Sequence, residues 1–323
     1  MERHSQIYVA GGDTLVGAAL LRELKRQGFT NLVGEPPTEP DLTNKVEVDE
    51  FFRIHNIEYV FLAAGKAAGI RGNQLYPATL MLDNLFVECH VIDAAHRFGA
   101  KKLLYLASCC TYPKLCPQPM AVSSLMTGPM EPTNEAYALA KMAGITLCQA
   151  YAREHKSNFI VGIPANIFGT DDHFTADGGH VIPALIARLH AAKLEDKPTV
   201  EIWGTGNARR EFLFADSLAD AALFAMREYS DTQTPLNLGG GEDLSIRETA
   251  EAIQEVVGYQ GDLVFDVTKP DGMPLKSLDS SPLLRMGWQP RTTFVAALAE
   301  TYEAFLRGEH NKAQEGIHAR AVL

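Results

Sequence analysis

The chain has 323 residues, 46% of them hydrophobic and 21% charged, and its 29 Lys and Arg against 40 Asp and Glu give a net charge of −11. This composition is that of an ordinary globular protein, and the acidic balance argues against a nucleic-acid-binding surface. The five cysteines form no CxxC pair and no apolar run approaches a transmembrane span, so we expect no metal site, no disulfide framework and no membrane partner.

Strand and helix patterns alternate through the first half of the chain. Residues 6–17 predict a buried strand that ends in a glycine turn, and the helix LVGAALLRELKRQGF follows. Further strands are predicted at about 31–34, in YVFLAAG, at 101–108 and in NFIVGIPANIFG, and further helices in VEVDEFFRIHN, at 78–98 and at 135–155. Regular alternation of this kind predicts an α/β fold with a Rossmann-type, doubly wound parallel sheet.

Beyond about residue 170 the pattern loosens into loop-rich segments. Helices are predicted near 180–193, 216–229, 245–257 and 293–307. We expect a dinucleotide-binding Rossmann domain in residues 1–170 and a smaller α/β substrate-binding lobe in residues 171–323. The segment FLFADSLADAALFAMRE predicts that about 212–240 return to the core, so the two parts are interleaved.

The first strand ends in a turn that could hold a dinucleotide. Gly11, Gly12 and Gly17 stand in GGDTLVG, where backbone N–H groups and the dipole of the following helix suit a pyrophosphate. The other interpretation is a tight turn without a ligand. Thr14 stands where the usual pattern has a further glycine, which would alter the approach of the backbone to the pyrophosphate.

The end of the second strand bears on the choice between NAD and NADP. It carries Glu35 in the sequence Gly-Glu-Pro-Pro, and Asp13 stands in the glycine turn. Both carboxylates would repel a 2′-phosphate unless a lysine or arginine arrives from elsewhere, so they favour NAD(H). The alternative is that both are solvated loop residues.

Three residues form a candidate catalytic set. Tyr137 and Lys141, four apart on a predicted helix, share one face, and Ser108 ends a predicted strand, where ligands of such sheets bind. A neighbouring ammonium would bring the pKa of a tyrosine closer to the working range, and a serine can share the carbonyl oxygen. A YxxxK spacing alone is a common accident, but its place after the glycine turn and the serine favours catalysis.

Five long segments are similar to one known family. They are SCCTYPKLCPQPM (108–120), EPTNEAYALAKMAGI (131–145), GGHVIPALIARLHAAK (178–193), EIWGTGNARREFLF (201–214) and TKPDGMPLKSLD (268–279). Over nearly its whole length the chain resembles the GDP-L-fucose synthase family, the GDP-4-keto-6-deoxy-D-mannose 3,5-epimerase-4-reductases among the extended short-chain dehydrogenases.

The resemblance implies roles for particular residues. The catalytic residues would be Ser108, Tyr137 and Lys141 for reduction, with Cys110 and His180 as the acid/base pair of epimerisation. The residues that face the GDP-sugar would be Asn166, Arg188, Trp203, Arg210 and Asp279. The residues around the cofactor would be Gly11, Gly12, Asp13, Thr14, Leu15, Val16, Gly17, Glu35, Asp41, Leu42, Leu62, Ala63, Ala64, Lys66, Ala107, Tyr137, Lys141, Pro164, Asn166, Ile167 and His180.

Several of these residues have a structural alternative. His180 could cap the helix that follows it, and Cys110 could be a small buried hydrophobe beside an exposed Cys109. Trp203 could be a core aromatic. The arginines at 188 and 210 could be solvated charges.

The cofactor loops depart from the family. Its members usually carry a basic residue at the position of Asp13, glycine at Thr14 and arginines around Glu35, all associated with NADPH; this chain has none of them. Other changes cluster around the sugar, where an arginine-lysine pair becomes Leu275-Lys276. The resemblance implies NADP(H), whereas Asp13 and Glu35 favour NAD(H).

The resemblance implies an NAD(P)H-dependent epimerase-reductase that converts a GDP-4-keto-6-deoxyhexose to a GDP-deoxysugar such as GDP-L-fucose. It also implies a homodimer that packs through the helices near 78–98 and 135–155. Two narrower alternatives are a single-function GDP-sugar 4-reductase and a redox-neutral GDP-sugar epimerase with tightly bound NAD; a remote one is a non-catalytic dinucleotide-binding protein. Because the amino terminus lacks the apolar segment of a signal peptide, we expect a cytoplasmic protein.

Overall fold

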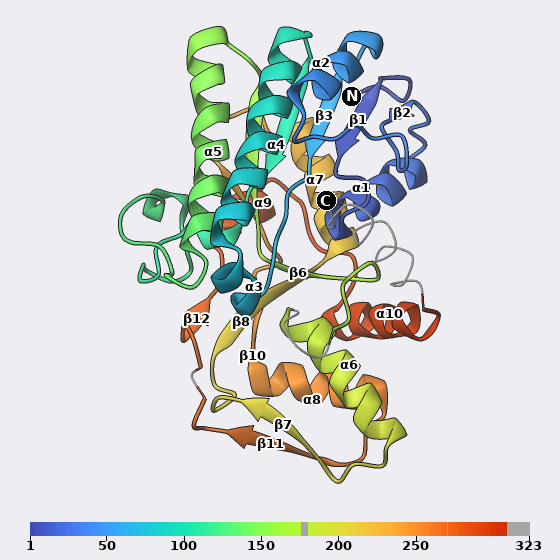
Figure 1. Ribbon diagram of the computed structural model, residues 1–323, viewed down its shortest axis with the longest axis vertical. Helices are drawn as coiled ribbons and strands as arrows, with labels where there is room; N and C mark the ends of the chain where they lie inside the picture. The colour runs from blue at the N-terminus through green and yellow to red at the C-terminus, as the bar shows by residue number, and fades with distance from the viewer. Residues whose placement is uncertain (176–179, 270, 309–323) are drawn as a thin grey trace.

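The main body of the protein is a six-stranded parallel sheet between two layers of helices. The computed structural model describes residues 1–175, 180–269 and 271–308 (Figure 1). The strands lie in the order β2-β1-β3-β4-β5-β9, and every pair is parallel. Their bounds are β1 Ile7–Ala10, β2 Leu32–Val33, β3 Tyr59–Leu62, β4 Lys102–Leu106, β5 Phe159–Pro164 and β9 Leu236–Leu238. The predicted Rossmann-type sheet is therefore confirmed.

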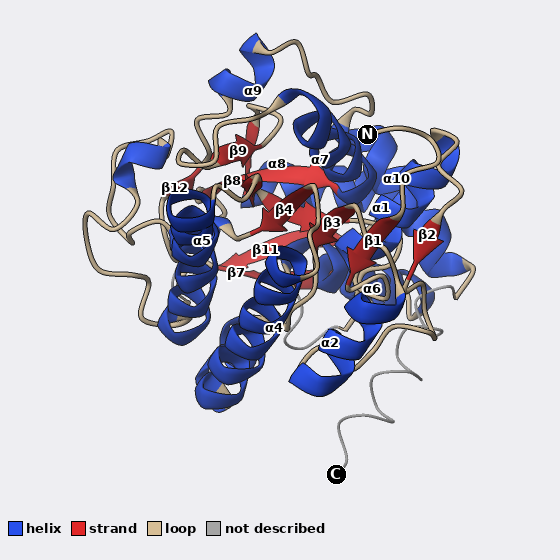
Figure 2. Cartoon of the chain, turned by 90° about the horizontal axis from the view of Figure 1, so that it is seen from above, coloured by secondary structure: helices blue, strands red, loops and turns tan. Residues whose placement is uncertain are grey.

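Helices cover both faces of this sheet. Seen from above, α2 (Lys45–Ile54), α4 (Pro77–Arg97) and α5 (Glu135–His155) lie on one side, and α1 (Leu15–Arg26) and α7 (Ala215–Glu228) lie on the other (Figure 2). The central strands are almost completely buried, as expected for a parallel sheet with both faces covered. The helices cover the two faces of the sheet but not the carboxyl ends of its strands, which point toward the later part of the chain (Figure 1).

The later part of the chain builds two small sheets and a second apolar core below the main sheet (Figure 1). One sheet has the order β10-β8-β12, with β6 paired to β8, and the other pairs β11 with β7. The strands are β6 Asn166–Phe168, β7 Thr199–Trp203, β8 Arg209–Phe214, β10 Asp243–Ser245, β11 Asp262–Asp266 and β12 Leu275–Lys276, and the packed helices are α6 Val181–Leu194, α8 Ile246–Val257 and α10 Phe294–Leu306. The sequence pattern predicted these helices but not most of these strands.

The segment NFIVGIPANIFG, predicted as one strand, is two. It contributes β5 to the main sheet, then breaks at Ala165, whose N–H donates to Leu238 of β9, and continues as β6 beside β8. Short helical pieces, α3 and α9 and two 3₁₀ turns, complete the chain: Ile70–Leu75, Ser281–Arg285, Cys109–Thr111 and Val122–Ser124.

Residues of the later part return to the main body. Helix α7 packs on α1, and β9 pairs with β5 at the edge of the main sheet. The buried Trp288 indole donates to Asp220 of α7 at 2.9 Å. The domain boundary near residue 170 stays a prediction.

Within the described ranges no helix is both long and apolar enough to cross a membrane, and no group of three or more His, Cys, Asp or Glu could hold a metal ion. All five cysteines are free thiols.

Candidate active site

The glycine turn after β1 is tightly packed and leaves no room for side chains. Gly11 has φ +85, and a Cβ on it would lie 2.6 Å from the Ala64 Cα; a Cβ on Gly17 would lie 1.8 Å from the Gly11 carbonyl oxygen. The turn therefore fits against the segment that follows β3 and brings the backbone close to any ligand. The first turn of α1 has no acidic residue, so its N–H groups and dipole suit a pyrophosphate.

Thr14 has a clear structural role in this turn. It is the N-cap of α1: its Oγ1 accepts the Gly17 N–H at 3.0 Å and donates to the Gly11 carbonyl at 2.7 Å. Where the usual pattern has a glycine, the Thr14 hydroxyl caps the helix and so fixes where the helix starts.

A carboxylate missed by the sequence analysis lies on the turn. Glu39 accepts the Gly11 N–H at 2.7 Å and the Tyr8 hydroxyl at 2.8 Å. Glu35, the residue singled out from the sequence, instead forms an ion pair with Lys25 of α1. A lysine that could offset the charge of a 2′-phosphate is thus present, but it is already paired with Glu35.

Other predicted cofactor residues lie at the same edge of the sheet. Asp41 Oδ1 accepts the N–H and hydroxyl of Thr43, at 2.9 and 2.8 Å, and the exposed Lys66 pairs with Asp83 at 2.6 Å. Apolar residues at or just beyond the carboxyl ends of β3, β4 and β5 are buried and form the floor; they are Leu62, Ala64, Ala107 and Pro164.

Ser108 and Tyr137 meet at the carboxyl end of β4. Ser108 caps the 3₁₀ turn that follows the strand, where its Oγ accepts the Cys110 N–H at 3.2 Å, and it also hydrogen-bonds the Tyr137 hydroxyl. Burial, followed by the charge of Cys110, raises the pKa of Tyr137, and the Ser108 hydrogen bond opposes this rise. The expectation that the pKa of Tyr137 is lowered therefore does not hold in this structure.

Lys141, the third residue of the set, is paired with a buried carboxylate. Its Nζ is 3.2 Å from Glu88 Oε1, in a pair whose side chains are only 5% and 1% exposed. The Tyr105 hydroxyl donates to the same carboxylate oxygen at 2.7 Å, and its ring lies 5.2 Å from the ammonium. Burial raises the pKa of Glu88, with Lys141 and Tyr105 acting against it. Sequence analysis missed Glu88, although an acid inside the apolar stretch LFVECHVI was a signal.

Cys110 is the more accessible thiol of its pair. Cys109 is 5% exposed and points its Sγ at Asn166 Oδ1, 3.9 Å away, so the alternative of an exposed Cys109 is wrong. The Cys110 Sγ accepts hydrogen bonds from Asn134 Nδ2 at 3.1 Å and from Lys276 Nζ at 3.5 Å. The hydrogen bond from Cys109 is the largest influence on Cys110; burial opposes it, Lys276 adds to it, and the pKa of Cys110 falls well below its ordinary value.

His180 stands at the start of α6 without capping it through its side chain. The ring is therefore not committed to the helix, and the capping alternative is not what the structure has. The protein packed around the ring lowers the pKa of His180, while the nearby charge of Cys110 raises it. The charge of Cys110 thus reaches the ring of His180. Residues 178 and 179, which begin the family-like stretch before His180, lie outside the described residues.

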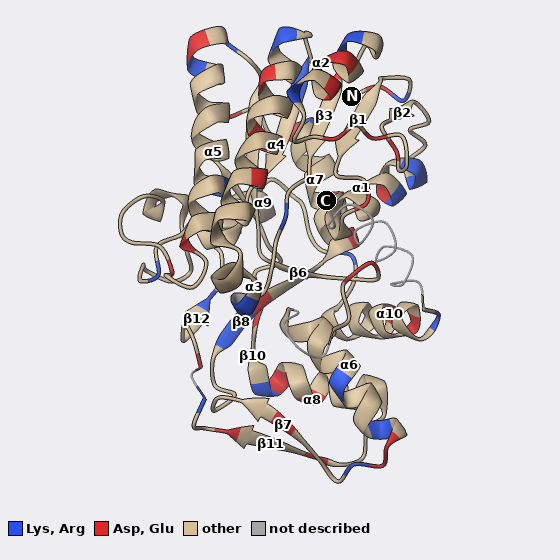
Figure 3. Cartoon of the chain, viewed as in Figure 1, with Lys and Arg blue, Asp and Glu red and all other residues tan. Residues whose placement is uncertain are grey.

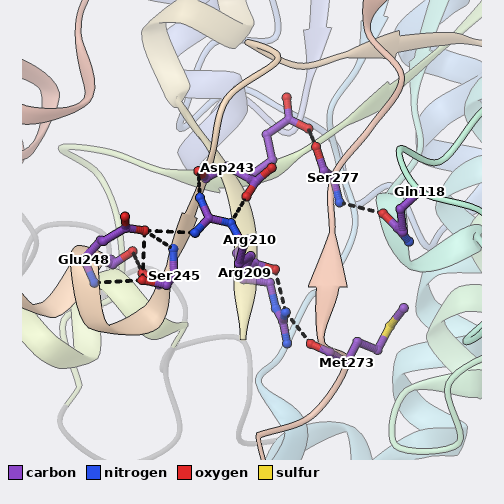
Figure 4. A network of polar contacts seen from close by, with 10 residues as sticks. Gln118, Arg209, Arg210, Asp243, Ser245, Glu248, Met273 and Ser277 are labelled. Carbon is purple, nitrogen blue, oxygen red and sulfur yellow. Dashed lines mark hydrogen bonds and ion pairs between the residues drawn. The ribbon is translucent and has the colours of Figure 1, made fainter. Parts of the chain in front are cut away.

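Basic residues line β8 and β12 beside this site (Figure 3). Arg210 of β8 is in register with Lys276 of β12, and its guanidinium donates to the carbonyls of Arg209 and Met273 at 2.7 and 2.6 Å (Figure 4). Burial lowers the pKa of Arg210, and the nearby Cys109 raises it. Arg209 instead turns away to Asp243 and Glu248 of the small sheet and α8 (Figure 4).

The remaining predicted sugar residues lie around these strands. Arg188 of α6 donates to the Glu201 carbonyl of β7. On the same strand Trp203 is 65% exposed, so it is not a core aromatic. Asn166 Nδ2 donates to the Glu211 carbonyl at 2.8 Å, and Asp279 Oδ1 accepts the Ser281 N–H at 3.2 Å.

Comparisons with known proteins agree with this geometry. The profile of the NAD dependent epimerase/dehydratase family matches residues 7–239. GDP-L-fucose synthase 1 of Arabidopsis thaliana is 46% identical over 96% of this chain and 96% of its own, and GDP-L-fucose synthase of Escherichia coli K12 is 42% identical over 94% and 97%. The crystal structure of a GDP-L-fucose synthetase from Naegleria fowleri bound to NADP superimposes with a TM-score of 0.87 at 27% identity, covering 96% of each chain. The chain therefore belongs to the GDP-L-fucose synthase group of the NAD-dependent epimerase/dehydratase family.

Proposed function

We propose that this chain is an NAD(P)H-dependent epimerase-reductase that converts a GDP-4-keto-6-deoxyhexose to a GDP-deoxysugar such as GDP-L-fucose. The observation that carries the proposal is the meeting of two sets of groups in one place. Ser108 and Tyr137 suit reduction of a carbonyl, and Cys110 with His180 suits proton exchange at carbon. The names of the relatives support the same reaction.

Epimerisation would use Cys110 and His180. A 4-keto group makes the hydrogens on C3 and C5 acidic, so inversion needs a base on one face of the ring and an acid on the other. The two residues come from different elements, the turn after β4 and the start of α6, and His180 feels the charge of Cys110. Thiols and imidazoles exchange protons near neutral pH.

Reduction would use Tyr137 and Ser108. A nicotinamide cofactor, when held at the glycine turn after β1, would supply the hydride that C4 of the sugar needs. Tyr137, whose pKa is raised by burial, stays protonated at neutral pH and can donate its proton to the oxygen that becomes an alkoxide. Ser108 offers a further hydrogen bond to the same oxygen. Lys141, four residues after Tyr137 on α5, is held by its ion pair with Glu88.

The GDP-sugar would lie over β7, β8 and β12. Arg188 and Arg210 bring local positive charge to an acidic chain, as recognition of a diphosphate requires. The exposed ring of Trp203 suits stacking on a base or sugar. Asn166 and Asp279 each keep polar atoms beside the site.

For the cofactor, the proposed preference is NAD(H). Asp13 is exposed in the glycine turn, and Glu39 holds the Gly11 N–H, so two carboxylates lie where a 2′-phosphate would need cations. Lys25 lies beside this loop, where Glu35 neutralises its charge. Measurement of kcat/KM with NADH and NADPH tests the preference: a higher value with NADPH contradicts it, and Lys25→Ala should lower the NADPH value further.

One incubation tests the reaction itself. The enzyme is given GDP-4-keto-6-deoxymannose and each reduced cofactor in D₂O, and NMR follows the product. We expect deuterium at C3 and C5 and net oxidation of the cofactor. Cys110→Ala should abolish the deuterium signal, and Tyr137→Phe should slow cofactor oxidation by roughly 100- to 10,000-fold while deuterium still enters. Oxidation without deuterium would indicate a 4-reductase only, and deuterium without oxidation an epimerase only.

A homodimer is proposed through α4 and α5. These helices pack side by side on one face of the sheet and expose Leu82, Phe86 and Leu139. A second copy of the chain would cover this apolar surface. Light scattering should give the mass of a dimer, and Phe86→Glu should shift it toward a monomer; a monomeric wild-type mass contradicts the proposal.

A further inference from the structure

Lys276 lies against the Cys110 thiol although it comes from a distant part of the sequence. Its Nζ donates to the Sγ at 3.5 Å, and Asn134 Nδ2 donates to the same sulfur at 3.1 Å. An ammonium and an amide that both donate to one sulfur stabilise the thiolate over the thiol. Cys110 therefore has the surroundings typical of an activated cysteine, a nearby positive charge and a hydrogen-bond donor.

The backbone fixes Lys276 in this place from two sides. On one side β12 pairs with β8, with Lys276 opposite Arg210. On the other side the next residue holds the loop after the cysteines: the Met120 N–H donates to the Ser277 carbonyl at 2.8 Å, and the Ser277 N–H donates to Gln118 Oε1 at 3.2 Å (Figure 4). Lys276 is thus held by main-chain contacts and not only by its own charge.

The other charged groups around the sulfur do not cancel this ammonium. Lys276, Cys110 and Glu131 line a cavity of about 40 Å³, room for roughly one water molecule. Glu131 is paired with Lys114 at 3.2 Å, so its charge is already offset. His180 is a further titratable group near the thiol, because its imidazole feels the charge of Cys110.

The buried neighbours agree with a thiolate. Tyr137 and Cys109 are neutral donors of high pKa, both raised, and Cys109 hydrogen-bonds Cys110. Burial acts to lower the pKa of Lys276, but interactions with the adjacent sulfurs of Cys109 and Cys110 outweigh it and raise that pKa. Lys276 thus keeps its proton while the sulfur loses one.

We propose that Lys276 keeps Cys110 as a thiolate and so makes it the base of the epimerisation pair; this inference rests on the proposed function. The thiolate takes a proton from C3 or C5 of the keto-sugar, and the electron pair of the C–H bond passes to the carbonyl oxygen as an enolate. His180 gives a proton to the opposite face of that carbon, the enolate returns to a ketone, and both side chains reset by proton exchange with water. Lys276 acts through Cys110 and is a positioning residue.

The test measures the pKa of the Cys110 thiol in the free enzyme. The rate of iodoacetamide alkylation is followed against pH, with mass spectrometry of the Cys110 peptide to exclude the other thiols. Wild-type Cys110 should titrate below the ordinary value of about 8.5. Lys276→Met should raise the pKa by about one to three units and slow alkylation at neutral pH about tenfold or more. Lys276→Arg should retain most of the effect, and Lys197→Met, which removes an exposed lysine paired with Glu195, should change nothing.

Two results overturn the inference: an unchanged thiol pKa in Lys276→Met, or a wild-type value at or above that of an ordinary thiol. The second needs no variant, so it decides the matter even if Lys276→Met does not fold. Because no sugar is present, failure of the proposed function looks different. A wild-type enzyme with a lowered thiol pKa that incorporates no deuterium at C3 or C5 refutes the function and not the lysine–thiolate pair.

Discussion

Asp172 is a buried carboxyl whose charge should destabilise the protein at neutral pH. It is 6% exposed; its Oδ1 accepts the His173 N–H at 2.8 Å, whereas its Oδ2 is buried with no hydrogen-bond partner among the described residues. Burial raises the pKa of Asp172, the hydrogen bond from His173 opposes it, Asp171 adds to it, and the result is about 7. The substitution Asp172→Asn removes the charge and keeps the acceptor.

The magnitude follows from the shift in pKa. The ordinary value is 3.8, so the native carboxyl is shifted by about 3 units, each equivalent to about 1.4 kcal/mol. Because the native state binds this proton more tightly than the unfolded state, the free energy of unfolding falls as the pH rises from about 4 to about 7, by roughly 4 kcal/mol. The stabilisation by Asp172→Asn should therefore be about 3 kcal/mol larger at pH 8 than at pH 5.

Urea unfolding at these two pH values, followed by circular dichroism, measures the difference. Asp171→Asn is the matched control: Asp171 is a partly exposed neighbour paired with Arg22 at 2.6 Å, so its loss should change the free energy of unfolding by about 1 kcal/mol or less. An equal effect of Asp172→Asn at both pH values would refute the reasoning, because it would mean that the native carboxyl titrates like the unfolded one.

Three further predictions follow from the site. Glu88→Gln leaves the Lys141 ammonium buried without a counter-ion and should cost about 3–5 kcal/mol of unfolding free energy in urea titrations, whereas Tyr105→Phe should cost less; equal costs would contradict the ion-pair account. Gly17→Ala places a Cβ 1.8 Å from the Gly11 carbonyl oxygen and should disrupt the glycine turn, so calorimetry should show that cofactor binding is lost. Unchanged binding would refute the proposal that this turn holds the cofactor. Trp203→Ala, at a position 65% exposed, should raise KM for the GDP-sugar and leave unfolding free energy within about 0.5 kcal/mol; a large loss of stability would make it a packing residue.

The main sheet could be predicted because its strands are short, continuous apolar runs between amphipathic helices. The small sheets could not. Strand β7 alternates exposed and buried residues over only five positions, and β12 has two residues, so neither leaves a pattern that exceeds chance. Their partners lie far away in the sequence, as with β11 on β7 and β12 on β8. Tertiary pairing, and not local preference, makes them strands.

The residues of the candidate site also differ in whether a local sequence pattern could reveal them. Ser108 and Tyr137 stood out because a strand end and a helix face are local signals, whereas Cys110 was implied only by the resemblance. Glu39 and Lys276 did not, since each acts on a residue that only the fold brings near; Lys276 and Cys110 are 166 positions apart. Glu39 was missed for the same reason, because the conformation of a proline-rich loop decides which carboxylate reaches the turn, and Glu35 pairs with Lys25 instead.

The return of α7 and β9 to the main body has a consequence for how the chain must fold. Strand β5 is complete at Pro164, yet its outer edge stays unpaired until Leu236–Leu238 has been synthesised. A fragment that ends near residue 170 would carry both an open parallel-sheet edge and an uncovered apolar face on α1. We therefore expect that residues 1–170 do not fold as a separate unit, because the main sheet is completed by β9, which is translated after β6, β7 and β8 of the small sheets.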